Sequence, residues 1–203
     1  MTPAAAVQIA QAVYSAAPHI GDENTAARAT RYPPDALAFP GSNNFACWLA
    51  DLDAGAIPVA GLGRVHQGFW RAWCEIRQHV LALPYVATTI GHSEGAALAI
   101  LAAADLCAAG RPPAAVYAFE PPRVSADGTI GALLAAHGVA LHLYRNGNDV
   151  VPIVPRVLEP WQHPGPLTQV GVPSHPFPNV EDHLMQNVIR GVLAAGNEGT
   201  ANE

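Results

Sequence analysis

The stretch VATTIGHSEGAALAI, residues 86–100, decides the fold of this chain. Its first five residues are mostly β-branched and predict a short buried strand over 86–90. The alanine-rich run that follows predicts a helix over 95–109. Between the two lies the pattern G-x-S-x-G, with its serine at Ser93. A strand, a glycine turn and a helix in this order are typical of an α/β fold.

The glycine turn favours a nucleophilic serine. A sharp strand-to-helix turn crowds the backbone, so Gly91 and Gly95 must lack side chains while the hydroxyl of Ser93 is raised. The helix that follows places its first N–H groups, and the positive end of its dipole, beside a developing oxyanion. The pentapeptide also occurs by chance in glycine-rich chains. The strand before it and the helix after it favour the catalytic interpretation.

A nucleophilic serine needs a base and an acid that orients the base. In an α/β-hydrolase the acid and then the histidine follow the serine along the chain. Asp149 follows a strand predicted over 140–145, where open α/β sheets bind ligands, although Asn-Gly-Asn-Asp is also an ordinary turn. His183, expected at the start of the last helix, is the candidate base. His175, in the proline-rich segment before it, is the competing candidate.

Outside this segment, apolar periodicity predicts further strands and helices in alternation. The other expected strands are 36–40, 114–119, 140–145 and 167–172, and the other expected helices are 4–16, 44–52, 68–83, 130–137 and 181–195. This alternation predicts one α/β domain over residues 1–203, with a mostly parallel central sheet flanked by helices. Residues 196–203 are expected to be a frayed tail.

The composition argues against two other classes. The chain of 203 residues has a net charge of −6, and its ten positive side chains are all arginine and are scattered. A nucleic-acid-binding protein would show a basic patch instead. The longest apolar runs, 95–104 and 130–136, fall well short of the roughly 20 residues of a membrane-spanning helix. We therefore expect neither a nucleic-acid partner nor a transmembrane segment.

The cysteines and the N-terminus bear on the compartment. The three cysteines are odd in number and lack metal-ligand spacing, which is typical of free thiols in a reducing compartment. The first 18 residues lack the positively charged start of a signal peptide and are typical of an amphipathic helix. These features predict a cytoplasmic protein, with secretion by a non-classical route as the alternative.

Five blocks of sequence, in one order, resemble the class 3 lipases, the family of fungal triacylglycerol lipases and related feruloyl esterases. The blocks are FPGS at 39–42 with WLADL at 48–52, VHQGF at 65–69, GHSEG at 91–95, YAFEPPRV at 117–124, and RNGNDVVP at 145–152 with the Asp-His pair at 182–183. The resemblance implies an α/β-hydrolase fold. It also implies a carboxylic-ester hydrolase acting on lipid or small acyl esters, with transient contact to a lipid interface and no metal or cofactor.

The resemblance implies a role for each matched residue. Ser93 would be the nucleophile, Asp149 the orienting acid and His183 the base. The backbone N–H groups of Ser42 and Glu94 would form the oxyanion hole.

Residues 43–48 stand where members of the family carry a lid. The resemblance implies that Asn43, Phe45 and Trp48 contact the substrate there. Phe45 and Trp48 are three residues apart and would share one helix face, which core packing explains equally well.

Two glutamates depart from the family's pattern, since Glu94 replaces a leucine and Glu120 replaces a glycine. One interpretation is that both carboxylates lie near the nucleophile, favour a polar or cationic substrate and share one proton. In the other, Glu94 faces a polar surface and Glu120 caps a turn. Two further functions fit the same residues: a phospholipase or acyltransferase, and a non-catalytic binding module of hydrolase fold. The oligomeric state is left open.

Overall fold

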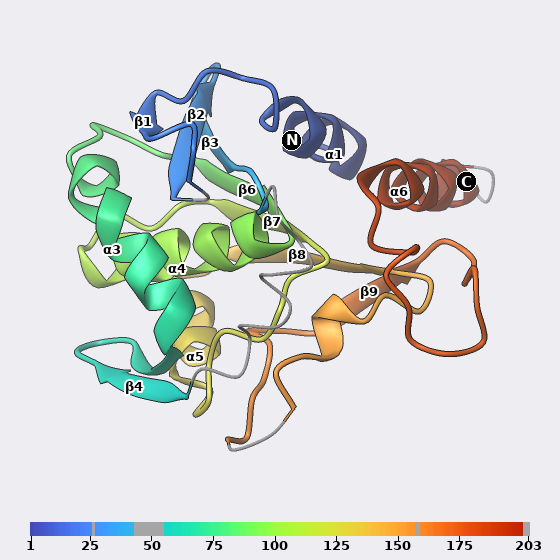
Figure 1. The fold of residues 1–203 in the computed structure, drawn as a ribbon. Coiled ribbons are helices and arrows are strands. Elements are labelled where there is room, and N and C mark those ends of the chain that lie inside the picture. The colour runs from blue at the N-terminus through green and yellow to red at the C-terminus, as the bar shows by residue number, and fades with distance from the viewer. Residues whose placement is uncertain (26, 43–54, 157–158, 201–203) are drawn as a thin grey trace.

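The computed structural model describes residues 1–25, 27–42, 55–156 and 159–200 (Figure 1). Its main sheet has seven strands in the order β1-β2-β3-β6-β7-β8-β9. Their bounds are β1 Ile20–Gly21, β2 Arg28–Tyr32, β3 Ala36–Phe39, β6 Thr88–His92, β7 Ala115–Phe119, β8 Ala140–Asn146 and β9 Leu167–Val170. The five neighbouring strands β3, β6, β7, β8 and β9 are parallel to one another, and β1 and β2 pair antiparallel at one edge of the sheet. The predicted mostly parallel sheet is confirmed.

Helices cover both faces of this sheet (Figure 1). One face carries α1 and α6, and the other carries α3, α4 and α5. The bounds are α1 Pro3–Ala12, α3 Gln67–Leu81, α4 Glu94–Ala108, α5 Thr129–Ala136 and α6 Met185–Thr200, with a short 3-10 helix η1 at Val151–Ile153. A separate hairpin is formed by β4 (Ala56–Val59) and β5 (Gly63–His66).

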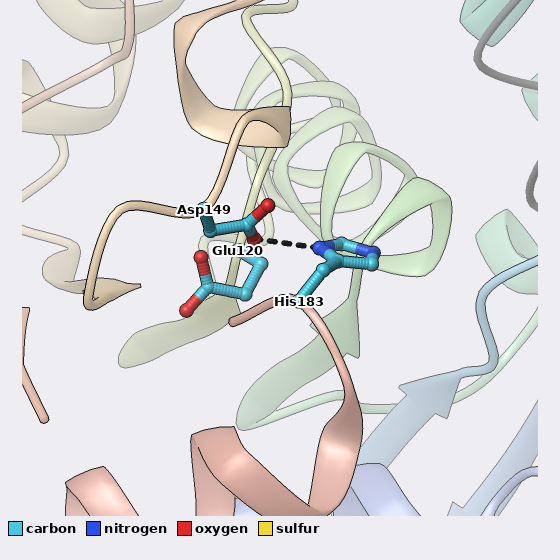
Figure 2. Close-up of side chains that lie close together, drawn as sticks. All are labelled: Glu120, Asp149 and His183. Carbon is cyan, nitrogen blue, oxygen red and sulfur yellow. Dashed lines mark hydrogen bonds and ion pairs between the residues drawn. The ribbon is translucent and has the colours of Figure 1, made fainter. Parts of the chain in front are cut away.

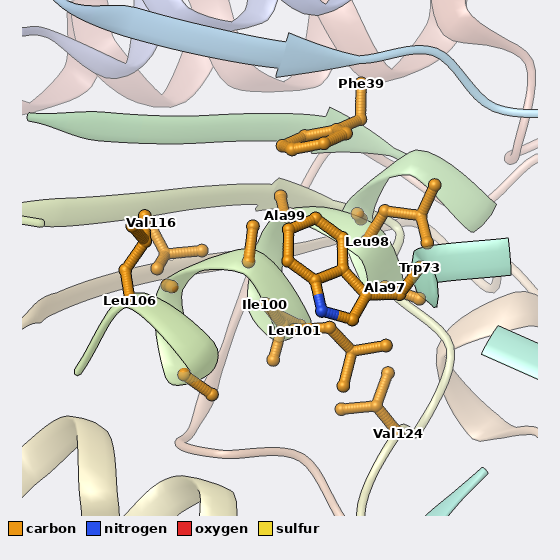
Figure 3. Close-up of a cluster of buried hydrophobic side chains, with 14 of the residues drawn as sticks. Phe39, Trp73, Ala97, Leu98, Ala99, Ile100, Leu101, Leu106, Val116 and Val124 are labelled. Carbon is orange, nitrogen blue, oxygen red and sulfur yellow. The ribbon is translucent and has the colours of Figure 1, made fainter. Parts of the chain in front are cut away.

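Helix α4 is buried on all sides, which explains why its sequence has no polar stripe. Its small alanine side chains let it lie close to the sheet and close to α3, whose Trp73 packs in the same cluster (Figure 3). Trp73 of α3 packs edge-on against Phe39 of β3, with ring centroids 6.3 Å apart, and its Nε1 donates to Asp105 of α4 at 3.0 Å. This packing ties α3 to β3 and to the C-terminal half of α4, the helix that begins at the G-x-S-x-G turn.

The structure adds strands that the periodicity did not predict. Strand β2 contains arginines at both Arg28 and Arg31 and no apolar alternation, so only its antiparallel pairing with β3 makes it a strand. The β4–β5 hairpin was missed because Pro58 interrupts its first strand. The helix predicted over 44–52 lies outside the described residues.

The last helix was predicted over 181–195 but runs from Met185 to Thr200. Residues 182–184 form a turn instead, because His183 N donates to Val180 O at 3.2 Å and Leu184 N donates to Glu181 O at 3.1 Å. Helix α6 extends to Thr200, into the tail predicted to fray from residue 196, and the fraying itself stays a prediction.

Candidate active site

The carboxyl ends of three neighbouring parallel strands bring the candidate residues together. Ser93 directly follows β6, Glu120 directly follows β7, and Asp149 lies in the loop after β8. His183 reaches the same edge from the turn that precedes α6. Parallel strands end at one edge of a sheet, which is where open α/β folds bind their ligands. Residues 90 positions apart in the sequence thus come into hydrogen-bonding contact.

The imidazole of His183 lies between a hydroxyl and a carboxylate. Ser93 Oγ lies 2.8 Å from His183 Nε2. On the other side of the ring, His183 Nδ1 lies 2.6 Å from Asp149 Oδ2, and Figure 2 shows this second contact. Because the carboxylate can only accept, Nδ1 carries the proton and Nε2 accepts from the serine. Ser93 is 2% exposed and His183 5% exposed. The competing His175 is exposed and pairs with Glu181 at 3.0 Å.

The backbone of the turn is strained in the way the glycine pattern predicts. Ser93 has φ 60° and ψ −129°, a conformation that costs an L-residue free energy. A Cβ on Gly91 would lie 2.1 Å from the carbonyl oxygen of Gly95, and a Cβ on Gly95 would lie 2.2 Å from that of Phe39. The turn therefore needs glycine at both positions.

Asp149 is held ionised inside the protein. Burial by itself raises the pKa of Asp149, but the charge of His183 and the hydrogen bonds to its oxygens outweigh burial and lower the pKa below its usual value. Val151 N, in η1, donates to Asp149 Oδ1 at 2.9 Å, so the two oxygens have different partners. An ionised, oriented carboxylate can hold the imidazole in one tautomer and stabilise its protonated form.

His92, just before the nucleophile candidate, links three parts of the chain below the turn. Burial, followed by the charge of His183, lowers the pKa of His92 to about 3. The neutral ring accepts from Tyr14 Oη at Nδ1, over 2.7 Å, and donates from Nε2 to the backbone oxygen of His183, over 3.1 Å. Tyr14 could not be identified from the sequence, since nothing in the residues after α1 indicates that they reach the site.

Asp182 anchors the two loops that carry Asp149 and His183. Its buried carboxylate accepts from Asn148 N at 2.7 Å and from Ser174 Oγ at 2.6 Å. Its backbone oxygen accepts from Asn146 Nδ2 at 2.9 Å. The Asp-His pair in the sequence is the signal that could have identified this anchor.

The two oxyanion-hole candidates, Ser42 and Glu94, lie in the segments that follow β3 and β6. The chain after β3 passes close to the serine, since a Cβ on Gly41, next to Ser42, would lie 3.1 Å from Ser93 Cβ. Glu94 is the first residue of α4, where a backbone N–H has no acceptor within the helix. The lid candidates Asn43, Phe45 and Trp48 lie outside the described residues.

The side chain of Glu94 should make stability depend on pH. Burial, followed by the charge of Glu75, raises the pKa of Glu94 from 4.5 to about 7. The folded state therefore binds this proton more tightly than the unfolded chain, so its contribution is complete below pH 4.5 and is lost as the pH rises through about 7. Between about pH 5 and pH 8 the free energy of unfolding should fall by about 2 kcal/mol more in the wild type than in Glu94→Gln. Urea unfolding at both pH values measures this difference, and parallel pH dependences in the two proteins would contradict it.

The parallel sheet, the strained turn and the serine–histidine–aspartate contacts define an α/β-hydrolase. The family model described as lipase (class 3) matches residues 36–159, more than half of the chain, and the chain belongs to this family. It is 32% identical over 176 residues to proteins named secreted mono- and diacylglycerol lipase A, from Penicillium cyclopium and Penicillium camembertii. These matches cover 81% of this chain and 56% of each relative, so the chain spans about half of their length.

A solved structure shares the fold. The triacylglyceride lipase of Rhizomucor miehei superposes with a TM-score of 0.63 at 23% identity, which covers 82% of this chain and 77% of that one. No helix among the described residues is long and apolar enough to cross a membrane.

The cytoplasmic location predicted from the sequence is wrong by comparison with these relatives, because the Penicillium proteins are named as secreted. The prediction relied on the absence of a leader and on cysteine number. Neither observation determines the compartment of a chain that spans only part of its relatives.

Proposed function

We propose that this chain is a serine carboxylic-ester hydrolase that works through an acyl-enzyme. The observation that carries the proposal is the pair of contacts made by His183, 2.8 Å to Ser93 Oγ and 2.6 Å to Asp149 Oδ2. Membership of the class 3 lipase family supports the same chemistry. The roles follow from the contacts: Ser93 is the nucleophile, His183 the general base and Asp149 the orienting acid.

The reaction proceeds in two acyl-transfer steps. His183 Nε2 takes the proton of Ser93 as Oγ attacks the ester carbonyl, and Asp149 stabilises the imidazolium that results. The tetrahedral oxyanion accepts hydrogen bonds from the backbone N–H groups of Ser42 and Glu94. The imidazolium then protonates the leaving alcohol, and His183 activates a water that releases the acid.

The substrate is a lipid ester or a small acyl ester. The support is the names of the Penicillium relatives, which act on mono- and diacylglycerols. The lid candidates Asn43, Phe45 and Trp48 remain predictions for the acyl site.

Two measurements test this function. A fluorophosphonate should label Ser93 stoichiometrically, as mapped by peptide mass spectrometry, and p-nitrophenyl esters from acetate to palmitate should be hydrolysed with one preferred chain length. Labelling elsewhere, or none, would support a non-catalytic binding module. Labelling of Ser93 with transfer of the acyl group to an added alcohol in preference to water would support an acyltransferase.

Glu94 should influence the choice of acyl chain. Its carboxyl group is the buried side chain directly after the nucleophile, and it remains polar whether or not it is ionised. Glu94→Leu should therefore raise the ratio of kcat/KM for palmitate to that for butyrate by roughly tenfold, because an apolar wall favours added methylenes. Glu94→Gln, which keeps a polar group of the same size, is the matched control and should leave this ratio near the wild-type value. An unchanged chain-length profile in Glu94→Leu would rule out this role.

A further inference from the structure

Glu120 occupies a backbone position that a side chain normally avoids. Its φ is 53°, and in the described part of the chain the other non-glycine residue with positive φ is Ser93. Such strain persists only where the surroundings impose it, and it gathers at functional sites. Glu120 is fully buried at the end of β7, between the strands that carry Ser93 and Asp149. The contacts of the Glu120 carboxyl group show why a glutamate stands here despite the backbone strain and the burial.

The two carboxyl oxygens of Glu120 have different surroundings. Oε1 accepts a hydrogen bond from Asn146 N at 2.6 Å. Oε2 is buried, and no donor among the described residues reaches it. A second carboxyl group lies close to this side chain, because Glu120, Asp149 and His183 each offer one atom within 4.8 Å of the others (Figure 2). An ionised Glu120 would leave Oε2 without a donor beside another carboxylate, which is an unfavourable arrangement in a buried site.

The charged groups around Glu120 do not supply that donor. Among the described residues, those that face it are Asp149, Arg145 and His183. Arg145 directs its Nε to the backbone oxygen of Asp149, at 3.1 Å. His183 uses its two ring nitrogens for Asp149 and Ser93.

We propose that Glu120 is a positioning residue of this site, protonated at neutral pH and donating from Oε2 to the Asp149 carboxylate. A neutral carboxylic acid matches both contacts, since its carbonyl oxygen accepts from Asn146 N and its hydroxyl donates to Asp149. Asp149 then accepts from three sides, from Val151, His183 and Glu120, and cannot rotate away from the imidazole. The sequence interpretation paired Glu120 with Glu94, but its partner is Asp149.

The electrostatics agree with this geometry. Burial, followed by the contact with Asp149, raises the pKa of Glu120 well above its usual value. The neighbouring carboxylate keeps the proton on Glu120, and the hydrogen bond from Glu120 adds to the charge of His183 in lowering the pKa of Asp149 against the effect of burial. Two close carboxyl groups whose pKa values move apart share one proton in this way.

The protonation of Glu120 can be measured without any catalysis. In the infrared spectrum at pH 7, the wild type minus Glu120→Gln difference should contain the C=O stretch of a protonated carboxylic acid. Glu94 contributes to both spectra and cancels. A difference that contains only carboxylate bands would overturn the proposal. This result stands whether or not the chain hydrolyses esters, so it separates the failure of this inference from the failure of the proposed function.

The positioning role rests on the proposed function and is tested by two variants of similar size. Glu120→Gln keeps one acceptor and one donor, so kcat/KM should stay within about twofold and the acid limb of its pH profile should not move. Glu120→Met removes the donor under the same backbone strain. It should lower kcat/KM by roughly tenfold or more and move the acid limb to higher pH, because the freed Asp149 carboxylate holds the proton of His183 more tightly.

An ionised Glu120 would give another pattern. Both variants would then remove one negative charge, and both would move the acid limb to lower pH. That outcome, or equal loss of activity in Glu120→Gln and Glu120→Met with unchanged pH profiles, would overturn the positioning role. Circular dichroism of each variant checks that the fold is retained.

Discussion

Ser93→Ala is expected to lower kcat/KM for p-nitrophenyl esters by at least about four orders of magnitude. The hydroxyl is the atom that attacks the carbonyl, and in the structure it is hydrogen-bonded to Nε2 of His183. The fold should persist, because alanine tolerates the positive φ as well as serine does. The substitution removes one hydrogen bond, the one to His183. We expect a loss of free energy of unfolding of about 1 kcal/mol. Steady-state kinetics and urea unfolding measure the two quantities.

The matched control is Ser15→Ala, which removes an exposed hydroxyl after α1 that donates to the local Ala12 oxygen at 3.3 Å. This variant should keep wild-type activity and stability. A Ser93→Ala protein that folds and retains more than about a tenth of wild-type activity would show that another residue supplies the nucleophile. Loss of fluorophosphonate labelling in Ser93→Ala, with labelling retained in Ser15→Ala, completes the comparison.

Gly95→Ala should destabilise the protein by about 3 kcal/mol or more and remove the activity. Gly95 lies in the first turn of α4, and alanine there would gain about 1 kcal/mol in helix propensity. The added Cβ would, however, lie 2.2 Å from the carbonyl oxygen of Phe39 and 2.5 Å from that of Pro40. These are backbone atoms, so relief requires moving the end of β3, which leads into Ser42. Urea unfolding and ester kinetics measure the two effects.

Gly196→Ala provides the matched control for this change. Gly196 is also helical, in α6, and apart from its own helix a Cβ there would meet no heavy atom of the described residues within 4 Å. We expect stability within about 1 kcal/mol of the wild type, with a small gain from helix propensity. A stable and active Gly95→Ala would mean that β3 and α4 can separate without cost to the site.

Local sequence predicted the central elements well and the edges poorly. The sequences of β6, β7 and α4 are rich in β-branched or apolar residues because these elements are buried, and the conformation of each follows from its own residues. Strand β2 depends on β3 for its hydrogen bonds, so its own sequence carries little signal. The start of α6 shifted to Met185 because contacts of Asp182 with the distant Asn146 and Asn148 hold the preceding turn.

The sequence by itself determined the turn and the order of the candidate residues. Two glycines around Ser93, between a β-branched strand and an alanine-rich helix, leave one backbone path, because steric exclusion acts between near neighbours. From the residues alone, the histidine remained a choice between His183 and His175. Only the tertiary structure places His183 against Ser93, and only it brings Glu120 beside Asp149. Such contacts join separate strand ends, and their partners and protonation depend on distances and burial that exist only once the parallel sheet has assembled.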